Sequence, residues 1–357
     1  MAEINIYRTT TMLAAVEQMA PATTFLRDRY FPFSNSDVFP TEDVLVEYRD
    51  STGNRLAPVV LPRKGEISVE RGGYTTARMT PPLVAPSRPL TIDHLNQKGF
   101  GENLYSDRTP AQRQAEILAQ DLAEFDVMIS NREEQIASQV MFTNGVTLRQ
   151  YADKYGTDEY VEYVLQFYAD GNDAVYTPDA MWNSVDTSSI FGDLGAMIRM
   201  LTRRGNNATE VLVGADVADV LMKSTGIKEI MDLQRFNVGS IEPVALPNGA
   251  ARLGRLNIGG RMIDLLTYDG TYIDEETGEV TSYVPEKMIC VTAPGAGRAL
   301  YGAVSQIEQN SGLWYTYQGR RVPRYWTEKD ARELRVASRP LFVPRTADAF
   351  IAATVLD

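Results

Sequence analysis

The chain has almost none of the side chains from which catalytic and metal sites are most often built. Its 357 residues include one cysteine, Cys290, and one histidine, His94. A single thiol cannot form an internal disulfide, so nothing in the sequence requires an oxidising compartment. One histidine without a serine elbow gives no recognisable Ser-His-Asp arrangement, and no Cys/His cluster has zinc spacing. We expect His94 to be a surface or interface side chain.

Cofactor-binding motifs are missing as well. There is no phosphate-binding GxxxxGK[ST] loop, and Gly295-Ala296-Gly297-Arg298 lacks the third glycine of a dinucleotide fingerprint. Asp269-Gly270-Thr271 has glycine at the second position, where a calcium loop needs it at the sixth. We interpret the paired carboxylates Glu133 and Glu134 as solvated groups on an exposed helix. The sequence therefore predicts a protein that is not an enzyme and that has no cofactor or metal.

Long apolar runs are also absent, and the charge is unbalanced. No run approaches the roughly 18 apolar residues that a membrane span needs, and no signal peptide is apparent. The formal net charge of −12 argues against a protein that reads DNA bases, although not against one that encloses DNA. Residues 101–187 carry 5 basic and 16 acidic side chains, which is nearly the whole excess. The simplest interpretation is a solvated helix face together with acidic loops.

The strongest structural signal is a long helix over residues 109–142. Thr109, Pro110 and Gln112 form an N-terminal capping pattern with proline in the first turn. Apolar residues then recur at helical spacing, and neither glycine nor proline interrupts the segment between Pro110 and Asn144. A helix of this length is on the order of 50 Å long, far beyond the usual domain helix. We therefore expect a spine, a coiled coil or a linker rod.

Before this helix, residues 55–92 are rich in proline. Six of the chain's 18 prolines lie between Pro58 and Pro89, and the stretch has too few apolar residues for a core of its own. It indicates a long protruding hairpin that must pack on something else. A flexible surface loop is the alternative, although loops of this length are usually functional or disordered.

The other expected elements follow from alternation and helical periodicity. Asp216 is expected to cap a helix after the strand at 210–214, and the C-terminal strands to complete a sheet beside the long helix. The remaining expected ranges are strands at 147–154, 159–168, 261–268, 280–293, 334–338, 341–343 and 350–355, and a helix at 188–203.

One basic stretch stands out near the C-terminus. Residues 320–339 carry seven basic and three acidic side chains, a net of +4. A surface with mixed ion pairs is one interpretation. The other is an intersubunit patch that faces the acidic segment of a neighbour, since complementary charge sets the register of assembly.

The order of these elements and several short motifs resemble the lambda-type major head proteins of tailed phages, which have the Hong Kong 97-type capsid fold. The resemblance covers nearly the whole chain, with residues 171–187 and 235–255 unmatched. The matching motifs include Tyr7-Arg8-Thr9-Thr10-Thr11, Tyr30-Phe31-Pro32-Phe33, Arg71-Gly72-Gly73, Pro81-Pro82-Leu83-Val84-Ala85-Pro86, Arg298-Ala299-Leu300-Tyr301-Gly302 and Ser338-Arg339-Pro340-Leu341.

The resemblance implies an α+β fold with five parts. These are an N-terminal arm (1–45), an extended E-loop (46–100), a peripheral domain with the spine helix (101–187), an axial domain (188–320) and C-terminal strands of the peripheral domain (321–357). We expect intersubunit contacts at Arg63, Lys64, Arg71, Gly72, Gly73, Tyr74, Arg320, Arg321 and Arg324.

The resemblance also implies a function and partners. We expect a structural subunit that assembles with itself, in pentamers and hexamers, into an icosahedral head around double-stranded DNA. The expected locations are the virion capsid and, during assembly, the host cytoplasm. With no long segment before the arm, we expect a separate scaffold protein, together with a decoration protein and a portal. An encapsulin-like compartment shell is the alternative, and a phage enzyme or small binding module is a rival class.

Overall fold

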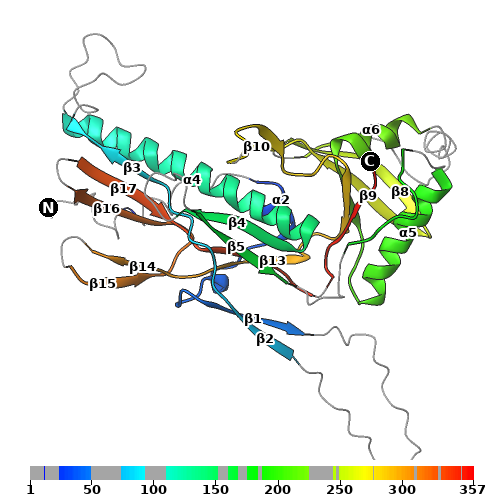
Figure 1. The fold of residues 1–357 in the computed structure, drawn as a ribbon, viewed down its shortest axis with the longest axis horizontal. Helices are drawn as coiled ribbons and strands as arrows, with labels where there is room; N and C mark the ends of the chain where they lie inside the picture. Colours follow the sequence, from blue (N-terminus) through cyan, green and yellow to red (C-terminus); the bar gives the residue numbers. More distant parts are fainter. Residues whose placement is uncertain are drawn as a thin grey trace, which may run out of the picture.

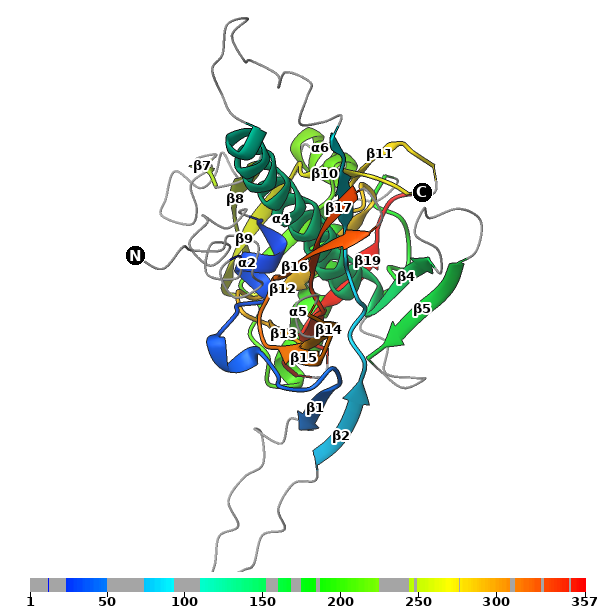
Figure 2. The ribbon, with the colours of Figure 1, turned by 90° about the vertical axis from the view of Figure 1, so that its left-hand side faces the viewer.

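A computed structural model describes thirteen parts of the chain (Figures 1 and 2). They are residues 12, 24–49, 74–92, 110–151, 160–167, 175–183, 187–224, 244–246, 249–275, 277–308, 312–328, 331–346 and 348–357.

The predicted long helix is confirmed as α4, Pro110–Thr143. Figure 1 shows it crossing the molecule, with small sheets along one half and a larger sheet at its C-terminal end. Near its middle, α4 buries apolar side chains such as Phe125 and Ile129 against Leu334 and Val336. After Thr143 the backbone of Asn144 is left-handed, with φ 54°, which ends the helix.

A six-stranded sheet forms the larger end of the molecule. Its strand order is β19-β12-β6-β9-β8-β7, and only the β6–β9 pair is parallel. The strands are β6 (Glu210–Val213), β7 (Val244–Ala245), β8 (Ala250–Ile258), β9 (Arg261–Tyr268), β12 (Met288–Thr292) and β19 (Ile351–Thr354).

Helices cover both faces of this sheet. Neighbouring residues of a strand point to opposite sides, so each strand can contribute side chains to the core on either face. Leu212 of β6 packs with Ile136 and Met141 of α4 in one core. Val211 and Val213 face the other core, which is built with α5 (Thr187–Arg203) and α6 (Ala215–Lys223). The alternation along β6 therefore explains why a four-residue strand is buried throughout.

Smaller sheets occupy the rest of the described chain. β16 (Val322–Glu328), β17 (Ala331–Ala337) and β3 (Ser87–Leu90) form a three-stranded sheet. The two-stranded sheets are β1 (Val44–Arg49) with β2 (Tyr74–Met79), β4 (Gly145–Tyr151) with β5 (Tyr160–Gln166), β10 (Thr271–Ile273) with β11 (Val280–Ser282), β13 (Gly297–Tyr301) with β18 (Pro340–Pro344), and β14 (Val304–Ile307) with β15 (Trp314–Tyr317). Helix α2 (Leu26–Tyr30) and the short turn η1 (Asn35–Asp37) precede them.

Most expected elements are confirmed, with three differences. The segment 280–293 is divided into β11 and β12. Asp216 does not cap α6, because Gly214 holds that position; a Cβ there would lie 2.3 Å from the carbonyl oxygens of Pro285 and Glu286. The three C-terminal strands all lie beside α4, as expected, but they enter three separate sheets and do not complete a single one. A strand pattern alone does not specify the partner strand.

Candidate functional site

The N-terminal segment is attached to α4 through one carboxylate. Glu134 of α4 accepts backbone N–H bonds from Phe25, Leu26 and Arg27, at 2.9, 2.7 and 2.9 Å. These are the first amide groups of α2, which have no acceptor within the helix itself. Glu134 is 1% exposed, and burial raises its pKa although the three amide donors lower it. Helix α2 is thus fixed to the spine by its own backbone.

The adjacent carboxylate, Glu133, lies at the centre of a buried charge cluster. Its oxygens accept from Arg321 Nη1 at 2.6 Å and from Arg27 Nη1 at 2.8 Å. Arg321 also donates to Asp126 at 2.7 Å. The cluster therefore joins α2, α4 and the start of β16. We define the buried charge cluster as Arg27, Asp126, Glu133, Arg320 and Arg321.

Our interpretation of Glu133 and Glu134 as solvated groups is wrong. Both side chains are at most 1% exposed. Glu133 lies four residues after Ile129 and three before Ile136, so it belongs to the apolar face of α4. The helical spacing was therefore a signal that could have placed it inside, and arginines from distant parts of the chain compensate its charge.

The electrostatics of the cluster follow from this pairing. Burial alone would raise the pKa of Glu133, but Arg321 and Arg27 hold it at about 2. Burial lowers the pKa of both arginines, but Glu133, together with Asp28 at Arg27 and Asp126 at Arg321, more than offsets it, so the pKa of both is raised. All three groups are therefore charged at neutral pH, and removing one would leave the others buried without compensation.

A second ion pair joins helix α2 to the six-stranded sheet. Arg29 Nε donates to Glu210 at 2.8 Å, and the buried hydroxyl of Tyr30 donates to the same carboxylate at 3.0 Å. Glu210 begins β6 and is 3% exposed. Residues 25–30 thus contact both the spine and the larger sheet, so they fix the two relative to each other.

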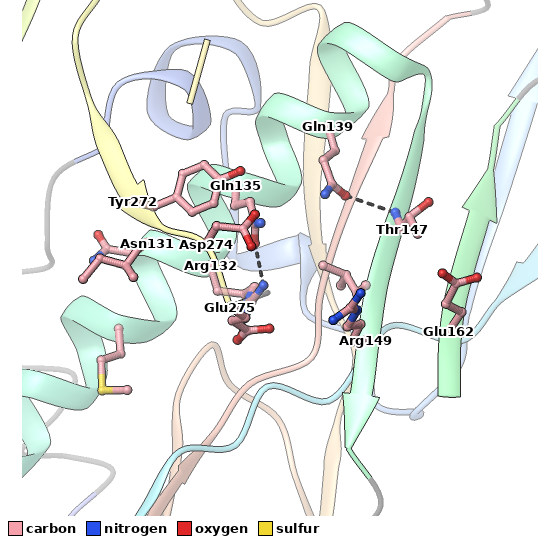
Figure 3. A pocket seen from close by; sticks show the side chains of 13 residues that line it. Asn131, Arg132, Gln135, Gln139, Thr147, Arg149, Glu162, Tyr272, Asp274 and Glu275 are labelled. Atoms are coloured by element: carbon pink, nitrogen blue, oxygen red, sulfur yellow. Dashed lines mark hydrogen bonds and ion pairs between the residues drawn. The ribbon is translucent and has the colours of Figure 1, made fainter. Parts of the chain in front are cut away.

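A polar groove lies on the other side of α4, where Figure 3 shows its lining. It has a volume of about 590 Å³ and runs between α4, β4 and the tip of the β10–β11 hairpin. Arg132 pairs with Glu275 across it, and Gln139 accepts from the backbone N–H of Thr147 at 3.0 Å. Its lining contains neither histidine nor cysteine. Within the described residues, no three His, Cys, Asp or Glu side chains are grouped as a metal site.

Large apolar side chains are exposed on the two-stranded sheets. Trp314 in β15 is 72% exposed and Leu313 beside it 59%. Val161 and Val164 of β5 are 66% and 63% exposed. A two-stranded sheet is marginally stable alone and leaves strand edges open. These surfaces therefore offer area for contact with another chain.

The predicted contact residues are distributed unevenly. Arg63, Lys64, Arg71, Gly72 and Gly73 lie outside the described residues, as does His94. Tyr74 is the first residue of β2, opposite Arg49 in the register.

Three other predicted contact residues lie at or near the start of β16. Arg321 is 7% exposed and has its partners within its own chain. Arg320 and Arg324 are half-buried, and the Arg324 guanidinium lies 4.8 Å from the Trp326 ring centre.

Comparisons with known proteins agree with this architecture. A family model described as phage major capsid protein E matches residues 8–355. No curated protein matches the chain. No helix in the described part of the chain is both long and apolar enough to cross a membrane.

Among solved structures, the chain is similar to a capsid protein from an Escherichia coli prophage. The identity is 14%, the match covers 97% of this chain and 98% of that one, and the TM-score is 0.63. It also matches the mature capsid of bacteriophage PhiM1, at 11% identity over 94% and 88% of the chains, with a TM-score of 0.46. An encapsulin of Synechococcus elongatus matches at 12% identity over 96% and 95%, with a TM-score of 0.40.

The fold is the α+β Hong Kong 97-type capsid fold that the resemblance implied. The family model extends over almost all of the sequence, from the N-terminal segment to β19. The chain belongs to the phage major capsid protein E family.

Proposed function

We propose that copies of this chain assemble into a closed icosahedral shell around the double-stranded DNA of a phage head, through pentamers and hexamers. The observation that carries this proposal is the match of the major capsid family over residues 8–355. The exposed apolar side chains on the two-stranded sheets support it, because they gain stability only when another surface covers them. In this proposal the chain is a structural subunit and not an enzyme.

The parts of the subunit have separate tasks in this proposal. We retain the division into an arm (1–45), an E-loop (46–100), a peripheral domain (101–187 and 321–357) and an axial domain (188–320). The E-loop packs on neighbouring subunits and completes their sheets, and the arm adds contacts with neighbours beyond those that α2 makes with its own subunit. Small hinge movements of the long helix and the loops let the same chain occupy unlike positions in the shell. The same movements let the shell expand during maturation.

The proposed contacts between subunits are those expected from the sequence. Around the E-loop they are Arg63, Lys64, Arg71, Gly72, Gly73 and Tyr74, and near β16 they are Arg320 and Arg324. Arg321 is already bound to Glu133 and Asp126, so its role is to hold the surface on which its two neighbours lie. Acidic side chains of residues 101–187 are the proposed counterpart, and the remaining negative charge keeps DNA from adhering to the wall.

Further partners belong to the same proposal. We propose a separate scaffold protein, a decoration protein on the finished shell and a portal. The locations are the host cytoplasm during assembly and then the virion capsid.

Electron microscopy of the purified protein tests the proposal. The expected particles are large, closed icosahedra, empty or filled with DNA. Small compartments that carry an enzyme cargo would support an encapsulin-like shell instead, and a protein that stays monomeric at high concentration would refute the proposal.

A variant sharpens this test. The backbone register pairs Arg49 directly with Tyr74, so an Asn-Gly turn in place of residues 50–73 would close β1–β2 as a two-residue hairpin. We expect a folded subunit that forms no shells, because the E-loop is gone while its base is kept. Normal shells from this variant would contradict the role proposed for the loop.

A further inference from the structure

A pocket of about 310 Å³ opens beside the buried charge cluster, between the segment after α2, strand β13 and the turn before β16. Its wall includes Arg27, Asp28, Phe33, Tyr301 and Arg320. The volume is enough for several water molecules or a small ligand. Two polar groups in this wall have hydrogen-bonding capacity that the ion pairs of the cluster do not satisfy.

The first unused group is the Arg320 guanidinium. It lies 5.0 Å from the Phe33 ring centre and 5.3 Å from that of Tyr301. Its nearest carboxylate oxygen, on Glu133, is 3.7 Å away, which is too long for a hydrogen bond. Its buried Nε has no acceptor among the described residues. The two rings thus fix the orientation of a guanidinium that still has donors to offer.

The second unused group is the hydroxyl of Tyr301. The side chain is 0% exposed, and the hydroxyl has no hydrogen-bond partner in the described part of the chain. A buried hydroxyl without a partner is destabilising, because it has lost its hydrogen bonds to water. Such a group in a native structure calls for a partner, for which a bound ligand or water is the usual explanation.

The charges around the pocket show which guanidinium is free to bind. Glu133 is occupied by Arg27 and Arg321, at 2.8 and 2.6 Å. Asp28 accepts from Arg27 at 2.8 Å, and Asp126 from Arg321 at 2.7 Å. The cluster and Asp28 together hold three arginines and three carboxylates, so a ligand would not bind through excess charge. It would bind through the one guanidinium of the three that has no hydrogen-bonded carboxylate.

We propose that this pocket binds an oxyanion, a carboxylate or a phosphate, through the guanidinium of Arg320 and the hydroxyl of Tyr301. Guanidinium groups bind such anions through paired, charge-assisted hydrogen bonds. The anion has two possible sources: a dissolved ion, or an Asp or Glu side chain of a second copy of the chain. The second source rests on the proposed function, and the first does not.

Thermal unfolding of the unassembled full-length subunit tests the first source. Inorganic phosphate is titrated against chloride at constant ionic strength for the wild type, Arg320→Gln, Tyr301→Phe and a control, Arg255→Gln. Arg255 forms an exposed ion pair with Asp264 in the six-stranded sheet. We expect phosphate to raise the Tm of the wild type and the control to a plateau. The rise should be lost in Arg320→Gln and reduced in Tyr301→Phe.

The tyrosine variant separates binding from a structural role. Without phosphate, Tyr301→Phe should be at least as stable as the wild type, because it removes a hydroxyl that has no partner. A large loss of stability without phosphate would show that the hydroxyl already has a structural partner, and would overturn its assignment as a ligand donor.

Assembly yield tests the second source. If phosphate leaves the Tm of the subunit unchanged, a neighbour's carboxylate predicts that Arg320→Gln lowers shell yield at least tenfold at a temperature where this variant is fully folded, while Arg255→Gln subunits assemble normally. Equal phosphate responses in all four proteins, together with equal assembly of Arg320→Gln and the wild type, would overturn the proposal. So would an equal loss of assembly in the control. A wild type that forms no shells refutes the proposed function alone, and the phosphate titration then decides the pocket.

Discussion

At the scale of single residues, the stability of the subunit depends on buried charge. Replacing Glu133 by Gln leaves Arg27 and Arg321 without their shared carboxylate, in a site where the three side chains are at most 6% exposed. We expect the free energy of unfolding of the monomeric subunit to fall by about 3–5 kcal/mol in a urea titration at neutral pH. The control is Glu124→Gln on the same helix, where the carboxylate is 59% exposed and pairs with Arg88; it should change stability by less than about 1 kcal/mol. Equal effects of the two variants would mean that the cluster does not stabilise the fold.

The same carboxylate predicts a pH dependence. The pKa of Glu133 is about 2 in the folded subunit, against an ordinary value of 4.5. Its lowered pKa means that the unfolded chain takes up the proton first. The stabilisation is therefore complete above about pH 4.5 and is lost as the pH falls towards 2. The free energy of unfolding should be measured from pH 6 to pH 2 for the wild type and Glu133→Gln. The difference between the two proteins should shrink over this window. A constant gap would contradict the assignment.

At the scale of elements, the close approach of α2 to β13 requires a glycine. A Cβ on Gly297 would lie 2.2 Å from the ring of Phe31, which packs with Phe342 and Phe350 in the core. We expect Gly297→Ala to displace this ring and to lower the free energy of unfolding by about 1–3 kcal/mol. The matched change is Gly192→Ala in α5, where a Cβ meets nothing within 4 Å. It should stabilise the subunit by up to about 1 kcal/mol, because alanine favours a helix. Chemical denaturation of both variants gives the test, and changes of the same sign would contradict it.

Element types could be predicted from the sequence where periodicity was strong. The helices α4 and α5 and the strand β9 appear at the expected residues, because each has a regular apolar face. The partners of strands that lie far apart in the chain could not be predicted, since their register depends on contacts between distant segments. The charge cluster was also missed, because helical spacing places Glu133 on the buried face but does not name the arginines, 106 and 188 residues away, that compensate it.

At the scale of the whole molecule, the described chain has two kinds of surface. The six-stranded sheet is covered on both faces by its own helices, so it is complete within one subunit. Among the described residues, the two-stranded sheets other than the buried β13–β18 pair keep apolar side chains in solvent, which is costly unless a neighbour covers them. The proposed shell therefore forms through the strand pairs, while the larger sheet serves as a rigid body.

Trp314 offers a test at this scale. It pairs with Ile307 across β14–β15 and is 72% exposed in the single subunit. Replacing it by Ser should leave the Tm of the unassembled subunit nearly unchanged, because an exposed side chain contributes little to folding. If the strand pair is an intersubunit contact, the concentration of protein needed for assembly should rise at least tenfold, since a buried tryptophan at an interface often contributes more than about 2 kcal/mol. Met222→Ser, which removes a 45% exposed apolar side chain from the end of α6, is the control and should assemble normally. Light scattering against protein concentration gives the midpoint for each protein. A midpoint for Trp314→Ser equal to that of the wild type would show that this strand pair stays exposed in the shell.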